Sequence, residues 1–308
     1  MPNKEVGLFL LGVLAVLLIA SAITFYLAKN NPGKDYTELV ARIKSWWVMI
    51  AAVSFCVYMG KTTLIIFFAF ISFLALKEYL SLIPTRRADR RLLFWAYWSI
   101  PFQYYWVSIE WYGLFIIFIP VYMFLFIPLR MVTLGETDGF LKAVGTLHWG
   151  LMTTVFSLSH IAFLLALPDE VSPAGSIALM LFLLVLTQFN DVSQYLWGKL
   201  LGEHKIIPKV SPNKTSAGLI GAMITITLLA MLLGPWLTPM TVLQSFGAGL
   251  IISFGGFIGD VTLSAVKRDI GIKDTGNLLP GHGGILDRVD SLTFSAPLFF
   301  HYIYFLHY

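Results

Sequence analysis

The chain has 308 residues, of which 57% are hydrophobic and only 12% are charged, with a formal net charge of +4. A soluble domain of this length carries about a quarter charged residues, so the composition excludes an ordinary soluble globular protein. Several apolar runs are long enough to cross a bilayer and the alternation of a transmembrane barrel is absent, so we predict an all-α, polytopic integral membrane protein.

The apolar runs predict nine or ten membrane spans. In chain order they are 7–28, 46–60, 63–83, 92–108, 111–128, 145–167, 174–190, 217–236, 241–259 and 291–307. The second run is short and begins at Trp46 and Trp47, as an interfacial aromatic belt does, so a half-inserted segment is the alternative there. We expect the first run to remain a helix, because it continues past the small residues that resemble a signal-peptide cleavage site.

Lys and Arg are divided unequally between the two sets of loops. Loops 29–45, 84–91, 129–144, 191–216 and 260–290 hold 18 of the 21 Lys and Arg. The positive-inside rule places these loops in the cytoplasm, both termini outside, and the chain in the cytoplasmic (inner) membrane. The Arg86 and Arg87 cluster is interpreted as such an anchor, with a lipid-headgroup contact as the alternative. The aromatic residues between 95 and 112 are interpreted as an interfacial belt.

Two regions are predicted. Residues 1–144 form N-terminal transmembrane helices that serve as a scaffold and offer contacts for a homodimer. Residues 145–308 form a catalytic transmembrane region whose cytoplasmic loops, 191–216 and 260–290, carry the active site. The positive charge is explained by topology, so membrane lipids are expected partners and nucleic acid is not.

The last loop concentrates charge in an apolar chain. Five of the 17 Asp and Glu lie between Asp260 and Ser291, among four Lys and Arg. Solvated loop charges and ordinary helix caps explain any one of these residues. They do not explain well why so many charges of both signs occur together. This combination favours a site for a metal or an anionic ligand.

The spacing in this loop predicts a site. If the ninth span continues as a helix, Asp260, Ser264, Lys267 and Arg268 share one of its faces. Carboxylates without Cys ligands favour Mg²⁺, with Mn²⁺ as the alternative.

The end of the loop supplies further carboxylates. Asp287 and Asp290 are three residues apart and are expected to meet Asp260 across the site. The glycines around His282 let backbone amides approach a ligand closely, and His282 itself is interpreted as a hydrogen-bonding group rather than a metal ligand.

The earlier polar loop offers a second set of groups. Asp191 stands where an apolar span meets the cytoplasm. Ser211 and Pro212 predict a helix start, whose free amides together with Lys214 would form a phosphate seat.

These segments resemble the signature of the phosphatidate cytidylyltransferase family, also called CDP-diacylglycerol synthases. The matching strings lie within 190–291 and read Ser264-x-x-Lys267-Arg268, then Lys273-Asp274, then His282-Gly283-Gly284-x-x-Asp287-Arg288-x-Asp290, preceded by Ser211-Pro-Asn-Lys214-Thr215. The resemblance implies a Mg²⁺-dependent transfer of the cytidylyl group of CTP to phosphatidate or a related lipid phosphate. A second, monovalent cation such as K⁺ is implied beside the Mg²⁺.

The resemblance also implies residue roles. Metal ligands would be Asp260, Asp287 and Asp290. Catalytic residues would be Asp260, Ser264, Lys267, Asp287 and Lys214. Substrate would be bound by Asp191, Tyr195, Ser211, Lys214, Thr215, Arg268, Lys273, Asp274, His282, Gly283, Gly284 and Arg288.

Two positions depart from the family pattern. Leu263 replaces a usual Glu, and Ser216 with Ala217 replaces a Trp-Glu pair, so a divergent subgroup is indicated. Two other functions remain open: a CTP-dependent lipid kinase of the polyprenol or phytol type, and a non-catalytic lipid-binding or transport protein on the same scaffold.

Overall fold

The computed structural model describes residues 3–30, 35–83, 90–276 and 283–308, and these residues are almost entirely helical. The elements are α1 Lys4–Asn30, α2 Thr37–Met59, α3 Lys61–Leu82, α4 Arg90–Ser108, α5 Tyr112–Ile117, η1 Phe118–Met123, α6 Phe124–Val132, α7 Phe140–Leu151, η2 Met152–Phe156, α8 Ser157–Ala166, η3 Asp169–Val171, α9 Ser176–Leu201, α10 Ser216–Leu237, α11 Val242–Asp269, α12 Leu286–Val289 and α13 Leu292–His307. The prediction of an all-α protein is confirmed.

Eight helical segments of the described chain are long and apolar enough to cross a membrane. Two of them are composite rods, one of α5, η1 and α6, the other of α7, η2 and α8. The two other predicted spans form helices as well, α4 and α13, which fall outside these eight. Helices satisfy every backbone polar group within the segment, as hydrocarbon requires, so the chain is a polytopic integral membrane protein.

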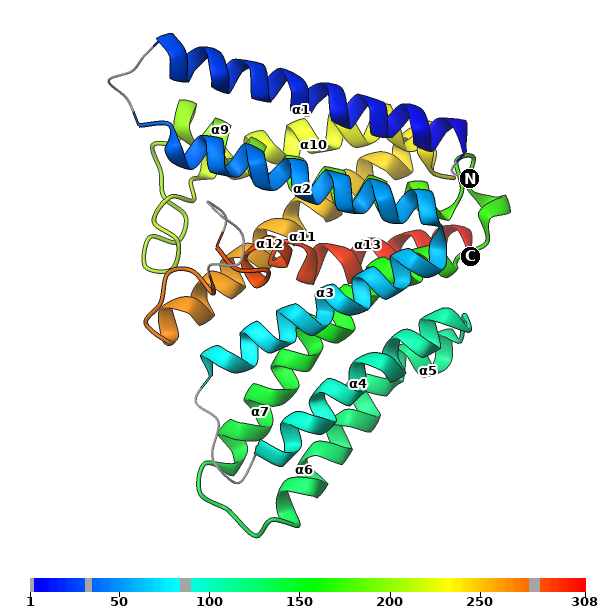
Figure 1. Cartoon of the computed structure of the whole chain (residues 1–308), viewed down its shortest axis with the longest axis vertical. Coiled ribbons are helices and arrows are strands. Elements are labelled where there is room, and N and C mark those ends of the chain that lie inside the picture. Colours follow the sequence, from blue (N-terminus) through cyan, green and yellow to red (C-terminus); the bar gives the residue numbers. More distant parts are fainter. Residues whose placement is uncertain (1–2, 31–34, 84–89, 277–282) are drawn as a thin grey trace.

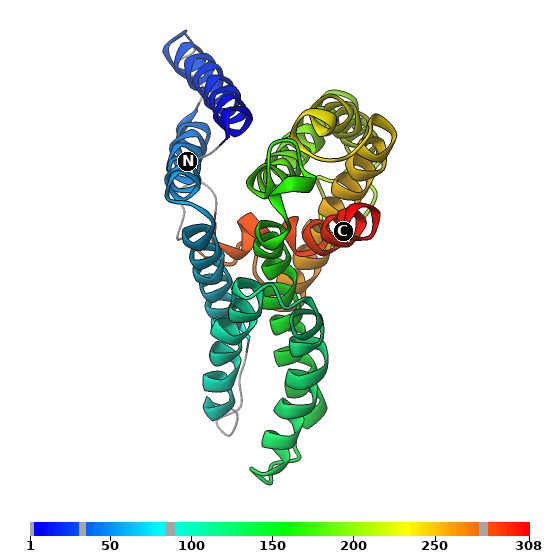
Figure 2. The ribbon, with the colours of Figure 1, turned by 90° about the vertical axis from the view of Figure 1, so that its right-hand side faces the viewer.

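The described helices form two groups that pack against each other. Helices α9, α10 and α11 pack side by side, and α13 lies between α11 and α8. Helix α3 packs against α2, α4 and α8 and also touches α12, while α4 to α7 extend away from the rest (Figures 1 and 2). Both chain ends lie at one end of the molecule, and α12 lies toward the other (Figure 1).

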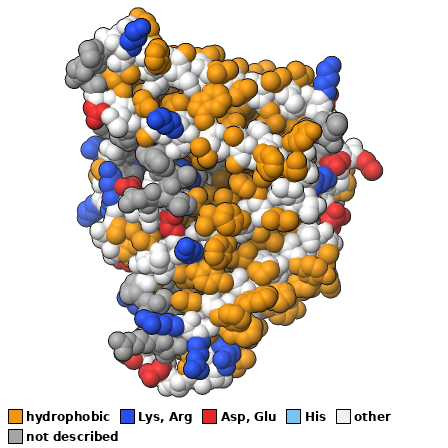
Figure 3. Space-filling model, viewed as in Figure 1, with side chains coloured by type: hydrophobic (Ala, Val, Ile, Leu, Met, Phe, Trp, Pro, Cys, Tyr) orange, Lys and Arg blue, Asp and Glu red, His pale blue; other side chains and the backbone are white. Residues whose placement is uncertain are grey.

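The surface matches a protein surrounded by lipid. Large apolar side chains such as Phe25, Leu232 and Leu243 are more than two-thirds exposed. Hydrophobic side chains cover the middle of the visible face, and most of its Lys and Arg gather toward the edge where the end of α11 lies (Figure 3). The helices therefore present apolar sides to the bilayer and charged ends to water.

The hydrophobic core is continuous between the two predicted regions. Leu64 and Leu76 on α3 belong to the same buried cluster as Phe182 on α9 and Phe299 on α13. Packing therefore fixes α3 against the C-terminal helices. The division of roles between 1–144 and 145–308 stays a prediction.

Helix α11 carries charged side chains of the site. It begins with a capping box in which the Thr241 hydroxyl accepts from Gln244 N and the Gln244 side chain accepts from Thr241 N. Its 28 residues reach about 42 Å, longer than the roughly 30 Å hydrocarbon layer. Its last turns, which hold Asp260 and Lys267, can therefore leave the apolar layer.

Three sequence predictions are corrected by the helix ends. Helix α2 begins at Thr37, so the second span is a full-length helix of 23 residues rather than a short one. Helix α9 continues to Leu201, so Asp191 lies on a helix and not in a loop. Tyr104, expected in an aromatic belt, is buried and hydrogen-bonded to Ser72 at 2.7 Å.

Candidate active site

Three carboxylates from separate elements approach one another around Ser291. Asp191 comes from α9, Asp260 from α11, and Asp290 from the junction of α12 and α13. Ser291 Oγ lies 2.9 and 3.1 Å from the two carboxylate oxygens of Asp191, and Ser291 N donates to Asp290 Oδ1 at 2.7 Å. Ser291 is fully buried, so it fixes two acidic side chains beside each other.

A glycine lets α11 come close to this junction. A Cβ on Gly259 would overlap the Asp290 carbonyl oxygen and would lie 3.2 Å from Ser291 Cα. Gly259 directly precedes Asp260, so this close contact brings the Asp260 backbone against the segment that carries Asp290. A larger residue at 259 would separate them.

Lys214 is the cation nearest to the three carboxylates. It forms an ion pair with Asp260, and its Nζ donates to Gln194 Oε1 at 2.7 Å. Burial disfavours the ammonium, but the attraction of Asp260, Asp191 and Asp290 outweighs burial and raises the pKa of Lys214 above its ordinary value. Lys214 therefore stays charged and neutralises part of the acidic cluster.

Asp290 is a carboxylate whose negative charge is only partly compensated. Burial, and then the negative charges of Asp260 and Asp191, raise the pKa of Asp290 well above its ordinary value, and Lys267 and Arg288 offset this only in part. Among the described residues, Arg288 Nε is buried without a hydrogen-bond partner. The negative charge around Asp290 is thus offset only in part, and Arg288 has an N–H free to donate.

Asp287 occupies a second, separate arrangement. Its Oδ1 accepts from Lys267 Nζ at 2.7 Å, and its Oδ2 accepts from Thr275 N at 2.8 Å and Gly284 N at 3.0 Å. Burial opposes ionisation, but Lys267 and the two N–H groups outweigh it and lower the pKa of Asp287. Both oxygens of Asp287 are thus held by donors, as are those of Asp260, whose Oδ1 accepts from Ser264 and whose Oδ2 pairs with Lys214.

The predicted face of α11 is divided between these arrangements. The helix does continue past Asp260, as predicted, and Ser264 Oγ donates back to Asp260 Oδ1 at 3.3 Å. Lys267 turns to Asp287. Arg268 is exposed and donates to the carbonyls of Val210 and Ile272, so it ties together the two polar loops rather than entering either arrangement.

The loop between α9 and α10 departs from the prediction of a helix start at Ser211. Helix α10 begins at Ser216, and the Thr215 hydroxyl caps it by accepting from Gly218 N at 3.1 Å. Ser211 and Lys214 belong to a turn closed by a Lys214 N to Ser211 O bond of 3.3 Å. The predicted helix start at Ser211 is therefore wrong, whereas Lys214 does lie at the acidic cluster, and phosphate binding there stays a prediction.

Among the other predicted substrate-binding residues, Gly283 lies against Asp287, since a Cβ on it would be 2.5 Å from Asp287 Oδ2. Tyr195 is 59% exposed on α9 and stands beside the Lys199 ammonium. Lys273 and Asp274 are exposed, and Gly283 adopts a left-handed conformation with a φ of 75°. His282 lies outside the described residues, as do Arg86 and Arg87 of the predicted anchor.

One acidic residue at the site was missed by sequence reasoning. Glu78, near the end of α3, accepts hydrogen bonds from Ile285 N at 2.8 Å and Leu286 N at 3.2 Å and from the Thr275 hydroxyl. Its partners lie about 200 positions away, between 197 and 208 along the chain. An ionisable residue near the end of an apolar span was the available signal.

A profile of the cytidylyltransferase family matches residues 40–306 of this chain. The chain belongs to the cytidylyltransferase family. The match begins within α2 and includes Glu78 as well as the two arrangements around Ser291 and Asp287, whereas α1 lies outside it.

This chain is similar to relatives of two kinds. The Uncharacterized protein YnbB of Escherichia coli (strain K12) is 46% identical over 289 residues, which are 94% of this chain and 95% of the relative. The Phosphatidate cytidylyltransferase of Staphylococcus aureus (strain COL) is 45% identical over 121 residues, 39% of this chain and 46% of that protein. The similarly named protein of Staphylococcus saprophyticus is 38% identical over 127 residues, again covering 46% of its length. The full-length similarity is thus to YnbB, and that to the named enzymes spans less than half of them.

The magnesium site expected from the sequence stays a prediction. Within the described part of the chain, no three His, Cys, Asp or Glu side chains lie close enough to hold an ion by themselves. Mg²⁺ usually needs only one or two carboxylates, because water and substrate phosphates complete its shell. The under-compensated cluster of Asp260, Asp290 and Asp191 fits that requirement.

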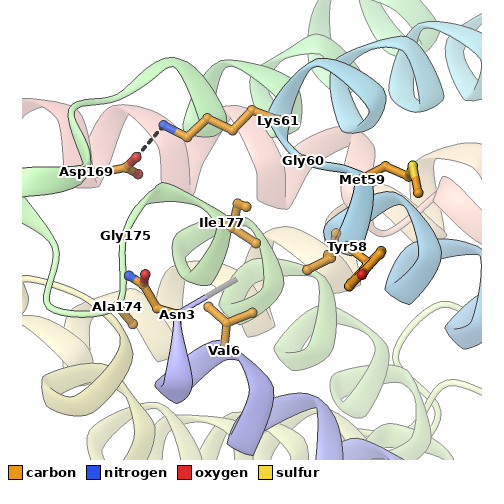
Figure 4. A pocket seen from close by; sticks show the side chains of 11 residues that line it. Asn3, Val6, Tyr58, Met59, Gly60, Lys61, Asp169, Ala174, Gly175 and Ile177 are labelled. Carbon is orange, nitrogen blue, oxygen red and sulfur yellow. Dashed lines mark ion pairs between the residues drawn. The ribbon is translucent and has the colours of Figure 1, made fainter. Parts of the chain in front are cut away.

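A cavity of about 340 Å³ lies elsewhere in the molecule. Asn3, Gly60 and Gly175 line it, and Lys61 pairs with Asp169 across it at 2.8 Å (Figure 4). Lys61 begins α3, whereas Glu78 lies 17 residues later, about 26 Å along the helix. The cavity is therefore at the opposite end of α3 from the candidate active site.

Proposed function

We propose that this protein transfers the cytidylyl group of CTP to phosphatidate, giving CDP-diacylglycerol and pyrophosphate. The observation that carries the proposal is the approach of Asp191, Asp260 and Asp290 to one another beside Lys214, in a chain of the cytidylyltransferase family. Such a cluster binds a cation, and cations are what a reaction between two polyanions needs.

The bond changes require no strong base. A phosphate oxygen of phosphatidate attacks the α-phosphorus of CTP. The bond from that phosphorus to the oxygen bridging to the β-phosphorus breaks, and the electron pair leaves with pyrophosphate. The attacking oxygen is already anionic at neutral pH, so no proton must be removed from it. Positioning and charge stabilisation supply the catalysis.

Protein cations take part in that stabilisation. Lys214 lies at the acidic cluster and would turn from Asp260 to phosphate oxygens when substrate enters. Arg288, whose buried Nε has no partner among the described residues, would donate to the same phosphates. Lys267, held by Asp287, would present its charge to the leaving pyrophosphate.

The acidic cluster would hold the metal. Asp260 and Asp290, with Asp191 beside them, are proposed to bind Mg²⁺, which when bound neutralises phosphate charge and polarises the α-phosphorus. Asp287 was predicted as a ligand too, but it accepts from Lys267, Thr275 and Gly284 in an arrangement separate from Asp260 and Asp290, so we propose that it orients Lys267. The additional K⁺ remains a prediction.

The site is proposed to face the cytoplasm at the inner membrane. The basic loop 191–216 and the end of α11 lie at its end of the molecule (Figure 1), and the positive-inside rule assigns the loops rich in Lys and Arg to the cytoplasm. CTP would then arrive from water, while phosphatidate enters sideways and its acyl chains stay in the bilayer. Contacts between two copies through 1–144 remain a prediction.

A product assay tests the proposal. Purified protein is incubated with CTP, Mg²⁺ and phosphatidate vesicles, and lipid and soluble products are identified by mass spectrometry. CDP-diacylglycerol with an equal amount of pyrophosphate is expected. A parallel reaction with polyprenol in place of phosphatidate tests the kinase alternative, for which phosphorylated polyprenol and CDP are expected. Absence of either product from folded protein would favour the non-catalytic alternative.

A further inference from the structure

Glu78 forms hydrogen bonds at both ends of the loop between α11 and α12, and Asp287 lies in α12, directly after this loop. At one end its carboxylate accepts from the Thr275 hydroxyl. At the other end it accepts from Ile285 N at 2.8 Å and Leu286 N at 3.2 Å. These contacts bridge from α3, in the predicted scaffold, to the predicted catalytic region.

The glycines of the loop make room for this carboxylate. A Cβ on Gly284 would overlap the Glu78 carboxylate, and a Cβ on Gly276 would lie 3.4 Å from its carboxyl carbon. The missing side chain at Gly284 therefore leaves the space that the Glu78 carboxylate occupies. Part of the glycine content of the loop is therefore explained by Glu78 rather than by a substrate.

Glu78 is connected to Lys267 through the hydrogen bonds of Thr275 and Asp287. Thr275 Oγ1 lies 2.9 Å from Asp287 Oδ2, and Thr275 N donates to the same oxygen at 2.8 Å. Asp287 in turn accepts from Lys267 Nζ at 2.7 Å. A path of hydrogen bonds thus runs from Glu78 through Thr275 and Asp287 to Lys267.

We propose that Glu78 is a positioning residue for cytidylyl transfer, which holds the loop so that Asp287 presents the Lys267 ammonium to the phosphates. This inference rests on the proposed function. Glu78 contacts none of the cations assigned to phosphate, so it acts through the loop. A shift of about 1 Å in a positioned group can cost about 100-fold in rate, so this indirect role is large enough to measure.

The first test compares Glu78→Gln with Glu203→Gln. At position 78 the amide keeps the size of the side chain but directs an NH₂ group toward N–H donors. We expect kcat to fall about 10- to 100-fold with the KM for CTP changed less than about threefold, because positioning and not ground-state binding is lost. Glu203 is exposed on the neighbouring loop and should leave both constants unchanged. An unchanged kcat in Glu78→Gln would overturn the proposal.

A double-mutant cycle tests the path itself. Thr275→Val removes the hydroxyl between Glu78 and Asp287. If both act through one path, the double variant should be about as slow as the slower single variant. Losses that multiply would show independent effects and would contradict a shared path.

Hydrogen exchange supplies a readout that does not depend on activity. In Glu78→Gln, peptides containing Ile285 and Leu286 should exchange faster than in the wild type, while peptides of α10 should not change. If the wild-type protein fails to make CDP-diacylglycerol, the proposed function fails, and faster exchange would still support the anchoring of the loop by Glu78. Unchanged exchange would overturn the anchoring whatever the activity.

Discussion

Asp260 is the residue at which the charges of the site converge. It pairs with Lys214, accepts from Ser264, and repels Asp290. Asp260→Asn keeps the shape of the side chain but removes its charge, which both Lys214 and a divalent ion need. We expect cytidylyl transfer to fall below about 1% of the wild-type rate, as for the loss of an electrostatic contact in the transition state.

The matched control for Asp260→Asn is Asp269→Asn. Asp269 ends the same helix and is exposed to solvent, so its amide variant should keep the wild-type rate. Size-exclusion profiles should show both variants folded. Turnover of folded Asp260→Asn close to wild type would remove Asp260 from the site.

The residues of the site could be predicted where they lie close together along the chain, and could not be predicted where they lie far apart. The spacing from Asp260 to Lys267 indicated one helix, and the helix is present. Thr275 and Asp287, which are hydrogen-bonded, lie 12 positions apart along the chain. Glu78 lies about 200 positions from Thr275. Only the packing of α3 against α12 brings Glu78 there, and no pattern within either segment encodes that contact.

At the level of elements, small residues set how closely α10 and α11 pack. A Cβ on Gly249 would lie 2.6 Å from Thr227 Cα and 3.0 Å from Ala230 Cβ, and backbone cannot move aside as a flexible side chain does. Gly249→Ala should therefore separate the two helices and destabilise the protein by about 1–3 kcal/mol, measured as a lower thermal midpoint in detergent.

Gly12→Ala is the control for this change in helix α1. A Cβ there meets nothing within 4 Å, so only helix propensity changes. We expect an unchanged midpoint or a gain of up to about 1 kcal/mol. Equal effects of the two alanines would show that close packing at Gly249 does not determine stability.

The start of α9 carries a pH-dependent contact. Asp169 pairs with Lys61 at 2.8 Å and accepts from Ser176 N at 2.8 Å. Burial opposes the charge, but these partners outweigh it and hold the pKa of Asp169 below its ordinary value of 3.8. A lowered folded-state pKa adds stability above the unfolded pKa, and that stability is lost as the pH falls through the folded pKa.

Asp169→Asn should therefore lower the free energy of unfolding at pH 7 and have no effect well below pH 3.8. The Asp169 side chain is 55% exposed, so solvent screening limits the expected loss to less than about 1 kcal/mol. Thermal midpoints against pH measure it, with Glu170→Gln as a neighbouring exposed control. A loss that grows on acidification would have the wrong sign.

Helix ends were the elements least well predicted. Ser211 followed by Pro212 resembles a helix start as closely as Thr215 does. The bridge between Lys205 and Thr215 and the bond from Ile206 N to Lys214 O hold the preceding segment in a turn, so the cap falls at Thr215. Such contacts across a loop compete with local propensity, and sequence spacing does not contain them.

For the whole molecule, the distribution of Lys and Arg predicts orientation. In a Cys56→Ser background, cysteines introduced in place of Lys205 and Lys273 should react with a membrane-impermeant maleimide only after cells are opened. A cysteine in place of Glu170, exposed at the other end of α9, should react in intact cells. The reverse pattern would place the site outside the cytoplasm and contradict the proposed route of CTP.

The all-α architecture could be predicted from composition, because only helices and closed barrels can span the hydrocarbon layer. Apolar length alone predicted helices at every one of the ten runs, and helices are present at each. How they pack was not accessible, since lipid-facing and protein-facing residues are both apolar. The sides of α3 that reach α8 and α12 became evident only in the folded chain.

The fate of the CTP phosphates tests the central claim most directly. Wild-type protein and phosphatidate vesicles are incubated in parallel with CTP labelled at its α-phosphorus and with CTP labelled at its γ-phosphorus, and lipids are then extracted. Cytidylyl transfer predicts α-label in the lipid as CDP-diacylglycerol and all γ-label in water as pyrophosphate. The appearance of γ-label in the lipid, or of neither label in the presence of folded protein, would contradict it.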